Sequence, residues 1–187
     1  MKNIEDEWSS IELLVKQLDA QDPLRDFKSL FFQADEHEIY LDGNSLGRLP
    51  LVTRRKMDEI IVDQWGKGLI RSWGESWYDA PTRIGDKLAG LIGAHPGEVI
   101  IADSTTINLF KLVVSALSIN SQRKQIISDV LNFPTDLYTI HGAVQMLNQG
   151  HSLLLLESQD GITLSLDDLK KALNENTALV TFSTPTF

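Results

Sequence analysis

The first half of the chain carries apolar residues at helical spacing. Within residues 9–30 they recur every three or four positions, which predicts a helix with one apolar face. Asp22-Pro23 is expected to interrupt this helix, because proline disfavours the helical conformation of the residue before it. A second helix is predicted over 51–66. A third follows Pro81, and its inward-facing residues are expected to be Ile84, Leu88, Leu91 and Ile92.

Shorter features separate these helices. Residues 38–41 predict a short strand, and the Gly- and Asn-rich stretch 42–47 predicts a tight loop, since both residue types tolerate positive φ. Residues 66–80 mix glycines with aromatic side chains and predict an ordered loop.

The second half alternates between strand and helix patterns. Strands are predicted at 98–102, 125–130, 153–157 and 178–182. Helices are predicted at 106–117, at 134–147 and, after a capping pair formed by Ser165 and Asp168, up to Leu173. Such alternation is typical of a parallel sheet covered by helices, so the predicted fold class is α/β, preceded by a helical N-terminal segment.

Composition narrows the possible functions. The 187 residues suit about one domain, and a net charge of −9 argues against a nucleic-acid-binding surface. The absence of cysteine excludes disulfides, thiolate metal sites and a cysteine nucleophile. No apolar run approaches the roughly 20 residues that span a bilayer, and the acidic N-terminus lacks the features of a signal peptide. We therefore expect a cytoplasmic protein with no membrane contact.

Three consecutive hydroxyl residues, Ser104, Thr105 and Thr106, form the first candidate site. They stand between the carboxyl end of a predicted strand and the start of a helix. Ligands of open α/β sheets bind at that edge, and the free N–H groups of a helix start favour a phosphate. The alternative is that Ser104 or Thr105 only caps the helix, and the spacing alone favours capping.

The stretch Asn132-Phe133-Pro134-Thr135-Asp136 forms the second candidate site, again between a strand and a helix. The Phe133 ring can stack on a flat heterocycle while Thr135 and Asp136 bind its polar rim. Alternatively, Phe133 is a core side chain at an ordinary helix start. If the strands are parallel, this loop and the Ser104 loop lie at the same edge of the sheet.

Other chemistries find little support. The four histidines lack metal-ligand spacing, so we expect no metal. A hydrolase nucleophile at Ser45 is not expected, and the dinucleotide-binding glycine pattern is absent. Trp73 and Trp77 either line an aromatic pocket or anchor a loop, and anchoring is the more common role.

Four motifs in this order resemble those of the kynureninases. They are Tyr40-Leu41-Asp42-Gly43-Asn44-Ser45-Leu46-Gly47, Gly68-Leu69-Ile70-Arg71-Ser72-Trp73, the Ser104–Asn108 segment and the Phe133–Asp136 segment. The resemblance implies a homodimeric pyridoxal 5′-phosphate enzyme of the aspartate aminotransferase fold (fold type I). Kynureninases hydrolyse L-kynurenine or 3-hydroxykynurenine to anthranilate or 3-hydroxyanthranilate and L-alanine, in tryptophan catabolism and NAD biosynthesis.

Residue roles follow from the same resemblance. It implies that Thr105 and Thr106 contact the cofactor phosphate, and that Phe133 stacks on the pyridine ring. Pro134, Thr135 and Asp136 would belong to the same cofactor loop. Ser183 would be a further cofactor contact, although its surroundings, Ser183-Thr184-Pro185-Thr186, depart from the family pattern. Ser45 and Trp73 would face the substrate.

The family's remaining catalytic residues are missing from this sequence. We find no counterpart of the Schiff-base lysine, of the aspartate and histidine beside the cofactor, or of the substrate-binding arginine, and Lys111, Lys170 and Lys171 fall inside predicted helices. The predicted sheet also looks unfinished. We therefore expect an N-terminal portion, inactive alone, with an arm and loop over 1–50 and the first part of the cofactor-binding domain over 51–187. The alternatives are another enzyme of this fold type, such as a desulfurase or aminotransferase, and an inactive dimerisation module.

Overall fold

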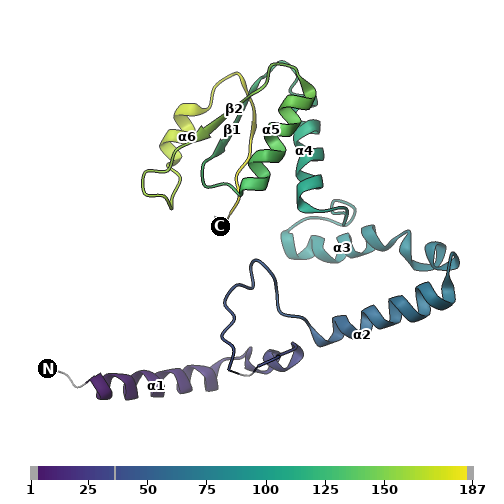
Figure 1. Cartoon of the computed structure of the whole chain (residues 1–187), viewed down its shortest axis with the longest axis vertical. Helices are drawn as coiled ribbons and strands as arrows, with labels where there is room; N and C mark the ends of the chain where they lie inside the picture. Colours follow the sequence, from purple (N-terminus) through teal and green to yellow (C-terminus); the bar gives the residue numbers. More distant parts are fainter. Residues whose placement is uncertain (1–3, 36, 185–187) are drawn as a thin grey trace. The chain divides into compact units, whose positions relative to one another are not determined.

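The chain consists of two compact units, Met1–Ala80 and Pro81–Phe187. The structure is a computed structural model that describes residues 4–35 and 37–184 (Figure 1). Each unit is described by itself below. The domain boundary expected at residue 50 stays a prediction.

The Met1–Ala80 unit is built mainly from helices. α1 spans Ile4–Gln21 and α2 spans Leu51–Glu59. A 3-10 helix covers Arg25–Leu30, and two segments of π-helical geometry cover Ile60–Gly68 and Trp73–Trp77. The predicted break at Asp22-Pro23 is confirmed, because α1 ends at Gln21 and the Asp22 carboxylate accepts a 2.8 Å bond from the Leu24 N–H. The loop predicted over 66–80 is wrong in part, since it contains the helical turn Trp73–Trp77.

The strand predicted over 38–41 is wrong, although the turn after it forms as expected. Side chains hold this segment in place of strand pairing. The Tyr40 hydroxyl donates to the Leu46 carbonyl at 2.6 Å, which closes the loop that carries Ser45. Arg48 pairs with Glu38 at 3.2 Å and lies over the Tyr40 ring, 5.2 Å from its centroid.

The Pro81–Phe187 unit contains the sheet. Its elements in chain order are α3 (Ala80–Ile92), α4 (Thr105–Ile119), β1 (Gln125–Asp129), α5 (Pro134–Leu147), β2 (Ser152–Leu156), α6 (Leu166–Ala172) and β3 (Thr177–Val180). The strands lie in the order β2-β1-β3, and both pairings are parallel. The prediction of an α/β fold with a parallel sheet is thus confirmed for these three strands. The finer assignment to fold type I stays a prediction.

The strand predicted over 98–102 is wrong, because this segment runs along α3 instead of entering the sheet. The Ile101 N–H donates to the Pro81 carbonyl at 3.2 Å, and the Gly97 N–H donates to the Asp86 carboxylate at 2.7 Å. The inward face predicted for α3 is wrong for the same reason. The buried residues of α3 are two small ones, Gly85 and Ala89. The apolar residues predicted to face inward are 38–81% exposed.

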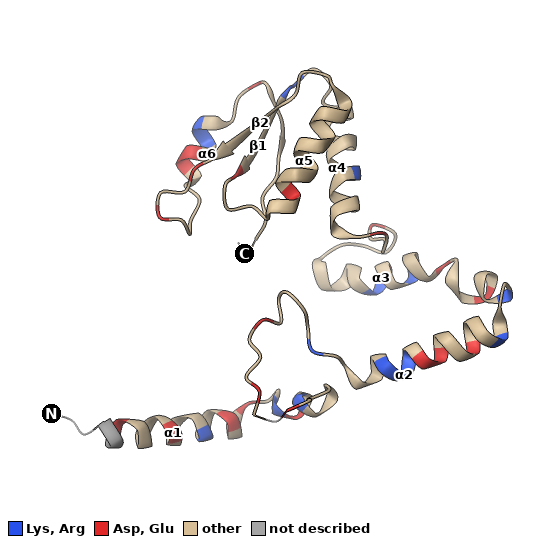
Figure 2. Cartoon of the chain, in the orientation of Figure 1, with Lys and Arg blue, Asp and Glu red and all other residues tan. Residues whose placement is uncertain are grey.

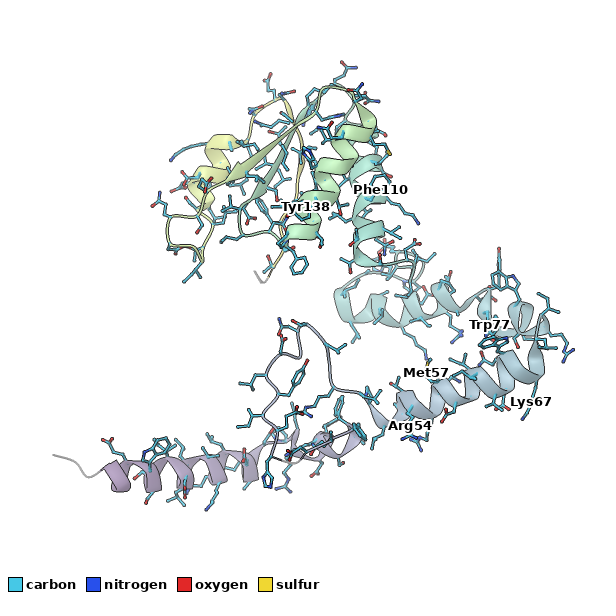
Figure 3. All side chains as sticks on the ribbon, viewed as in Figure 1. Arg54, Met57, Lys67, Trp77, Phe110 and Tyr138 are labelled. Atoms are coloured by element: carbon cyan, nitrogen blue, oxygen red, sulfur yellow. The ribbon has the colours of Figure 1, made fainter. Side chains whose placement is uncertain are left out.

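One apolar core joins α4 and α5 to the sheet. Its fully buried members come from both helices and from β1 and β3, and they are Val113, Leu117, Ile126, Ile140, Ala143 and Ala178. Phe110, labelled on α4 in Figure 3, packs against this cluster. β1 is the central strand of the sheet, and its last four residues are buried. The loop that follows β1 therefore starts at the carboxyl edge of the sheet.

His151, just before β2, is buried without a hydrogen-bond partner for either ring nitrogen among the described residues. Burial, and to a lesser extent the charge of Lys124, lower the pKa of His151 below its ordinary value of 6.5. The unfolded chain therefore binds a proton more readily than the folded chain does. We expect the stability that depends on neutral His151 to be complete above pH 6.5 and to be lost as the pH falls towards the lowered pKa.

Urea unfolding at a series of pH values checks this expectation. His151→Gln should flatten the fall in the free energy of unfolding below pH 6.5. His141→Gln is the control, because His141 is exposed on α5. Equal pH dependence in both variants would show that His151 does not cause the loss.

Candidate functional site

The carboxyl edge of the sheet brings predicted site residues from different strands together. β1 connects through α5 to β2 on one side, whereas β3 lies on the other side of β1. In open α/β sheets, ligands bind where the strand order changes direction in this way. At this edge the Ser183 hydroxyl donates to the Asp136 carboxylate at 3.4 Å, across 47 positions of sequence. The site therefore combines the loop after β1 with the segment after β3.

The loop after β1 presents an aromatic ring at the start of α5. Phe133 adopts an extended backbone with φ −56° and ψ 130°, and Pro134 occupies the first turn, where its missing N–H costs nothing. Phe133 is 47% exposed and is not a core side chain. Thr135 is exposed beside it, and Asp136 is half-buried. The ring and the polar groups are thus accessible to a ligand at the same edge.

The start of α4 lies at the same end of the unit. Asn120, which follows α4, donates from its side chain to the Ala178 carbonyl near the amino end of β3. Because α4 packs along α5 and β3, its first turn points towards the carboxyl edge, as the first turn of α5 does (Figure 1). Thr105 and Thr106 are exposed there. The capping alternative for Ser104 is confirmed, since its hydroxyl accepts from the Ile107 N–H at 3.4 Å.

Few charges surround these two helix starts. Lys111 is the one charged residue of α4 and Asp136 the one charged residue of α5 (Figure 2). Asp103, at a left-handed φ of 48° just before α4, forms an ion pair with Lys111. This pairing offsets a negative charge that would otherwise oppose an anion at the α4 start. Sequence reasoning missed the pair, because the sequence does not show that Asp103 adopts a left-handed backbone conformation before α4.

A buried polar pair supports the loop after β1. Ser128 is 0% exposed and Asn132 is 2% exposed, and the Asn132 amide donates to the Ser128 hydroxyl at 2.9 Å. The Asp129 carboxylate accepts from the Leu131 N–H at 2.7 Å and closes the turn between them. Our sequence analysis did not single out Ser128. Its position two residues after Ile126, on the core face of a central strand, was the available signal.

Ser45 and Trp73 belong to the other unit. Ser45 is exposed, and its N–H donates to the Asp42 carbonyl at 3.2 Å. Trp73 is 57% exposed and meets Tyr78 edge-on, with 6.5 Å between ring centroids. The Trp77 indole, labelled in Figure 3, donates to the Gln64 side chain at 2.6 Å and anchors its turn. The substrate roles of Ser45 and Trp73 stay predictions.

Two kinds of feature are not found in the described part of the chain. Within residues 4–35 and 37–184, no three His, Asp or Glu side chains gather as a group that could hold a metal ion. No helix in the same ranges is long and apolar enough to cross a bilayer.

The Pro81–Phe187 unit is therefore an α/β arrangement with a candidate ligand site at the carboxyl edge of its parallel sheet. No protein-family model matches the chain. Curated relatives do match, and those compared carry the name kynureninase. The chain is 42% identical to the kynureninase of Pseudomonas fluorescens over 168 residues, which is 87% of this chain and 38% of the relative.

Two further relatives agree with this match. The chain is 42% identical to a kynureninase of Burkholderia pseudomallei and 41% identical to one of Burkholderia mallei, each over 156 residues. Each of these matches covers 81% of this chain and 37% of the relative. The chain is thus a homologue of the kynureninases, as its motifs predicted, and it spans less than two fifths of the length of the relatives it matches.

Proposed function

We propose that this chain supplies part of the cofactor site of a kynureninase, a pyridoxal 5′-phosphate enzyme that hydrolyses kynurenine. The observation that carries the proposal is the contact between Asp136 and Ser183 at the β1/β3 edge, beside the exposed ring of Phe133. Relatives named kynureninase support it. A homodimer is part of the same proposal and rests on the family resemblance, and a cytoplasmic location rests on the composition of the chain.

The residues at this edge fit the chemistry of the proposed cofactor. Its phosphate needs N–H groups and hydroxyls, which the first turn of α4 offers together with Thr105 and Thr106. Its ring needs a flat apolar partner, and the Phe133 ring is accessible for stacking. Its polar rim needs hydrogen-bonding side chains, which Thr135, Asp136 and Ser183 supply.

Kynurenine hydrolysis adds water to the side-chain carbonyl and breaks the bond between that carbonyl carbon and the neighbouring Cβ. The products are anthranilate and alanine. When bound, pyridoxal phosphate supplies an electron sink for the carbanions of this reaction. The residues of this chain would bind the phosphate and fix the plane of the ring, and Ser45 and Trp73 would contact the substrate.

We do not propose Lys111, Lys170 or Lys171 as the residue that carries the cofactor. Lys111 is paired with Asp103 on α4. Lys170 and Lys171 pair with Asp167 and Asp168 on the exposed surface of α6. Because the chain spans 38% of the length of the Pseudomonas fluorescens relative, we propose that the cofactor-bearing lysine comes from sequence outside this chain.

Binding of pyridoxine 5′-phosphate tests the site directly. This probe keeps the ring and the phosphate but lacks the aldehyde, so its affinity does not depend on a lysine. We expect the wild-type chain to bind it, and Phe133→Ala to raise the Kd about tenfold through loss of stacking. Tyr138→Ala is the matched control, because Tyr138 is an aromatic residue on α5, the helix that Phe133 precedes, and is 74% exposed.

Titration followed by calorimetry or NMR gives the affinities. Inorganic phosphate, titrated separately, should bind the wild-type chain and the Phe133→Ala variant equally. Failure of the wild-type chain to bind the probe would contradict the cofactor site. An equal Kd for the Phe133→Ala and Tyr138→Ala variants would remove Phe133 from it.

A chimera tests the substrate. In the chimera, this chain takes the place of the aligned segment of the Pseudomonas fluorescens relative. Kynurenine and pyridoxal 5′-phosphate are added, and anthranilate fluorescence is followed. We expect anthranilate release. A folded, cofactor-loaded chimera that releases none would contradict kynurenine hydrolysis as the function of these residues.

A further inference from the structure

One buried side chain connects the end of β1 to the residue that carries the exposed ring. The Asn132 amide nitrogen donates to the Ser128 hydroxyl at 2.9 Å, inside the fold. The Asn132 amide oxygen accepts from the Phe133 backbone N–H at 2.8 Å. Asn132 thus uses both ends of its side chain, one on the strand and one on the turn.

Packing alone does not account for this pair. Ser128 and Asn132 are 0% and 2% exposed, and burying polar groups stabilises a fold less than burying apolar groups of the same shape. An alanine and a leucine would fill similar space without needing partners. The polar pair instead fixes the orientation of the Asn132 amide, because hydrogen bonds hold both ends of that group.

Two common constraints on a helix start are missing at the Phe133 turn. Phe133 provides no side-chain cap for α5, and Pro134 has no N–H to bond. The turn before it is closed by Asp129, whose carboxylate and carbonyl accept from Leu131 and Asn132. The Asn132 amide oxygen accepts from the backbone N–H of Phe133 itself, so this contact ties the Phe133 backbone to the buried amide.

We infer that Asn132 is a positioning residue of the proposed cofactor site, which holds the Phe133 ring in the orientation for stacking. The inference rests on the proposed function. Asn132 is buried and acts through Phe133, so it does not need to touch the ligand. Ser128 assists by holding the other end of the same amide.

Two variants test this role in the full chain. Asn132→Ala removes both hydrogen bonds. The double variant Ser128→Ala/Asn132→Leu also removes them, but it replaces the buried polar pair with an apolar pair and leaves no buried side-chain donor without a partner. The Phe133 backbone N–H, which belongs to a residue that is 47% exposed, loses its side-chain acceptor in both variants. Because such a replacement is nearly neutral for stability, we expect the double variant to stay folded.

Two NMR readouts separate positioning from stability. In both variants we expect the Phe133 amide to exchange with solvent about tenfold faster, which corresponds to ~1.4 kcal/mol of lost protection. We also expect the ring-current shift of the 2-methyl protons of bound pyridoxine 5′-phosphate to be lost. Affinity for inorganic phosphate should stay unchanged. A residue with only a structural role would not move the ring-current shift of a folded variant.

The outcomes distinguish this inference from the proposed function. If wild-type protein does not bind pyridoxine 5′-phosphate, both fail together. If wild-type protein binds it and the folded double variant keeps the wild-type ring-current shift, Asn132 does not position the ring and the proposed function stands. If neither variant folds, hydrogen exchange of the Phe133 amide in the wild-type protein is the deciding measurement. Fast exchange at that amide would overturn the inference.

Discussion

Gly85→Ala is expected to release the segment around Val99 from α3 and to lower the free energy of unfolding by about 2–3 kcal/mol. A Cβ at Gly85 would lie 2.0 Å from the Val99 carbonyl oxygen and 2.7 Å from its carbonyl carbon. Real Cβ atoms do not approach backbone atoms so closely. The neighbouring atoms belong to the main chain, so they cannot move aside as a flexible side chain would.

Gly90→Ala on the same helix is the matched control. A Cβ at Gly90 would meet nothing within 4 Å, and alanine is the better helix former, so this variant should gain up to about 1 kcal/mol. Urea unfolding measures both free energies. A Gly85→Ala variant as stable as the Gly90→Ala variant would show that the segment around Val99 is not held against α3.

Leu117→Ala is expected to cost about 2–5 kcal/mol, because Leu117 is completely buried in the core between α4, α5 and the sheet. The cost combines lost burial with the cavity that remains. The same substitution should also weaken binding of inorganic phosphate, since the core fixes the direction of α4 and so the place of Thr105 and Thr106.

Leu112→Ala provides the comparison for Leu117→Ala. Leu112 lies on the same helix and is 68% exposed, so its loss should change the free energy of unfolding by no more than about 0.5 kcal/mol. Thermal or urea unfolding gives both values. Similar losses for the two leucines would mean that α4 does not pack as described.

The sequence predicts the elements after residue 104 well, for a physical reason. In β1 and α5 the apolar positions follow the period of the element, and the turns between them carry strong local signals. Pro134 marks the start of α5, which spans Pro134–Leu147 as predicted. Ser165 caps α6 by accepting from the Asp168 N–H at 3.2 Å, as its spacing indicated. Local patterns suffice where local structure and packing agree.

Two predicted strands fail because a strand depends on a neighbour. Residues 98–102 are rich in β-branched side chains, but this composition suits any half-buried extended chain. Because Gly85 has no side chain, the segment packs against α3 instead of joining the sheet. Residues 38–41 carry three apolar or aromatic side chains in a row but pair with no strand among the described residues, and Tyr40 and Arg48 hold them through side-chain contacts. Partners distant in sequence are invisible to a local pattern.

The sequence likewise predicts only part of the candidate site. The sequence indicates that loops after parallel strands share an edge, and the structure places Phe133 and Asp136 there. It does not indicate that β3 lies beside β1, which is what brings Ser183 to Asp136. Nor does it show that Asn132 turns inward to Ser128, since an asparagine in a turn is usually solvated.

The strand order β2-β1-β3 also sets a sequence of events during folding. β1, α5 and β2 follow one another directly, so their pairing closes a short loop, whereas Gln125 and Thr177, which pair β1 with β3, are 52 positions apart. Closing the longer loop costs more entropy, and non-local contacts form later. Because Ser183 reaches Asp136 only once β3 has docked, the contact between the two loops of the candidate site forms with the later of these two strand pairings.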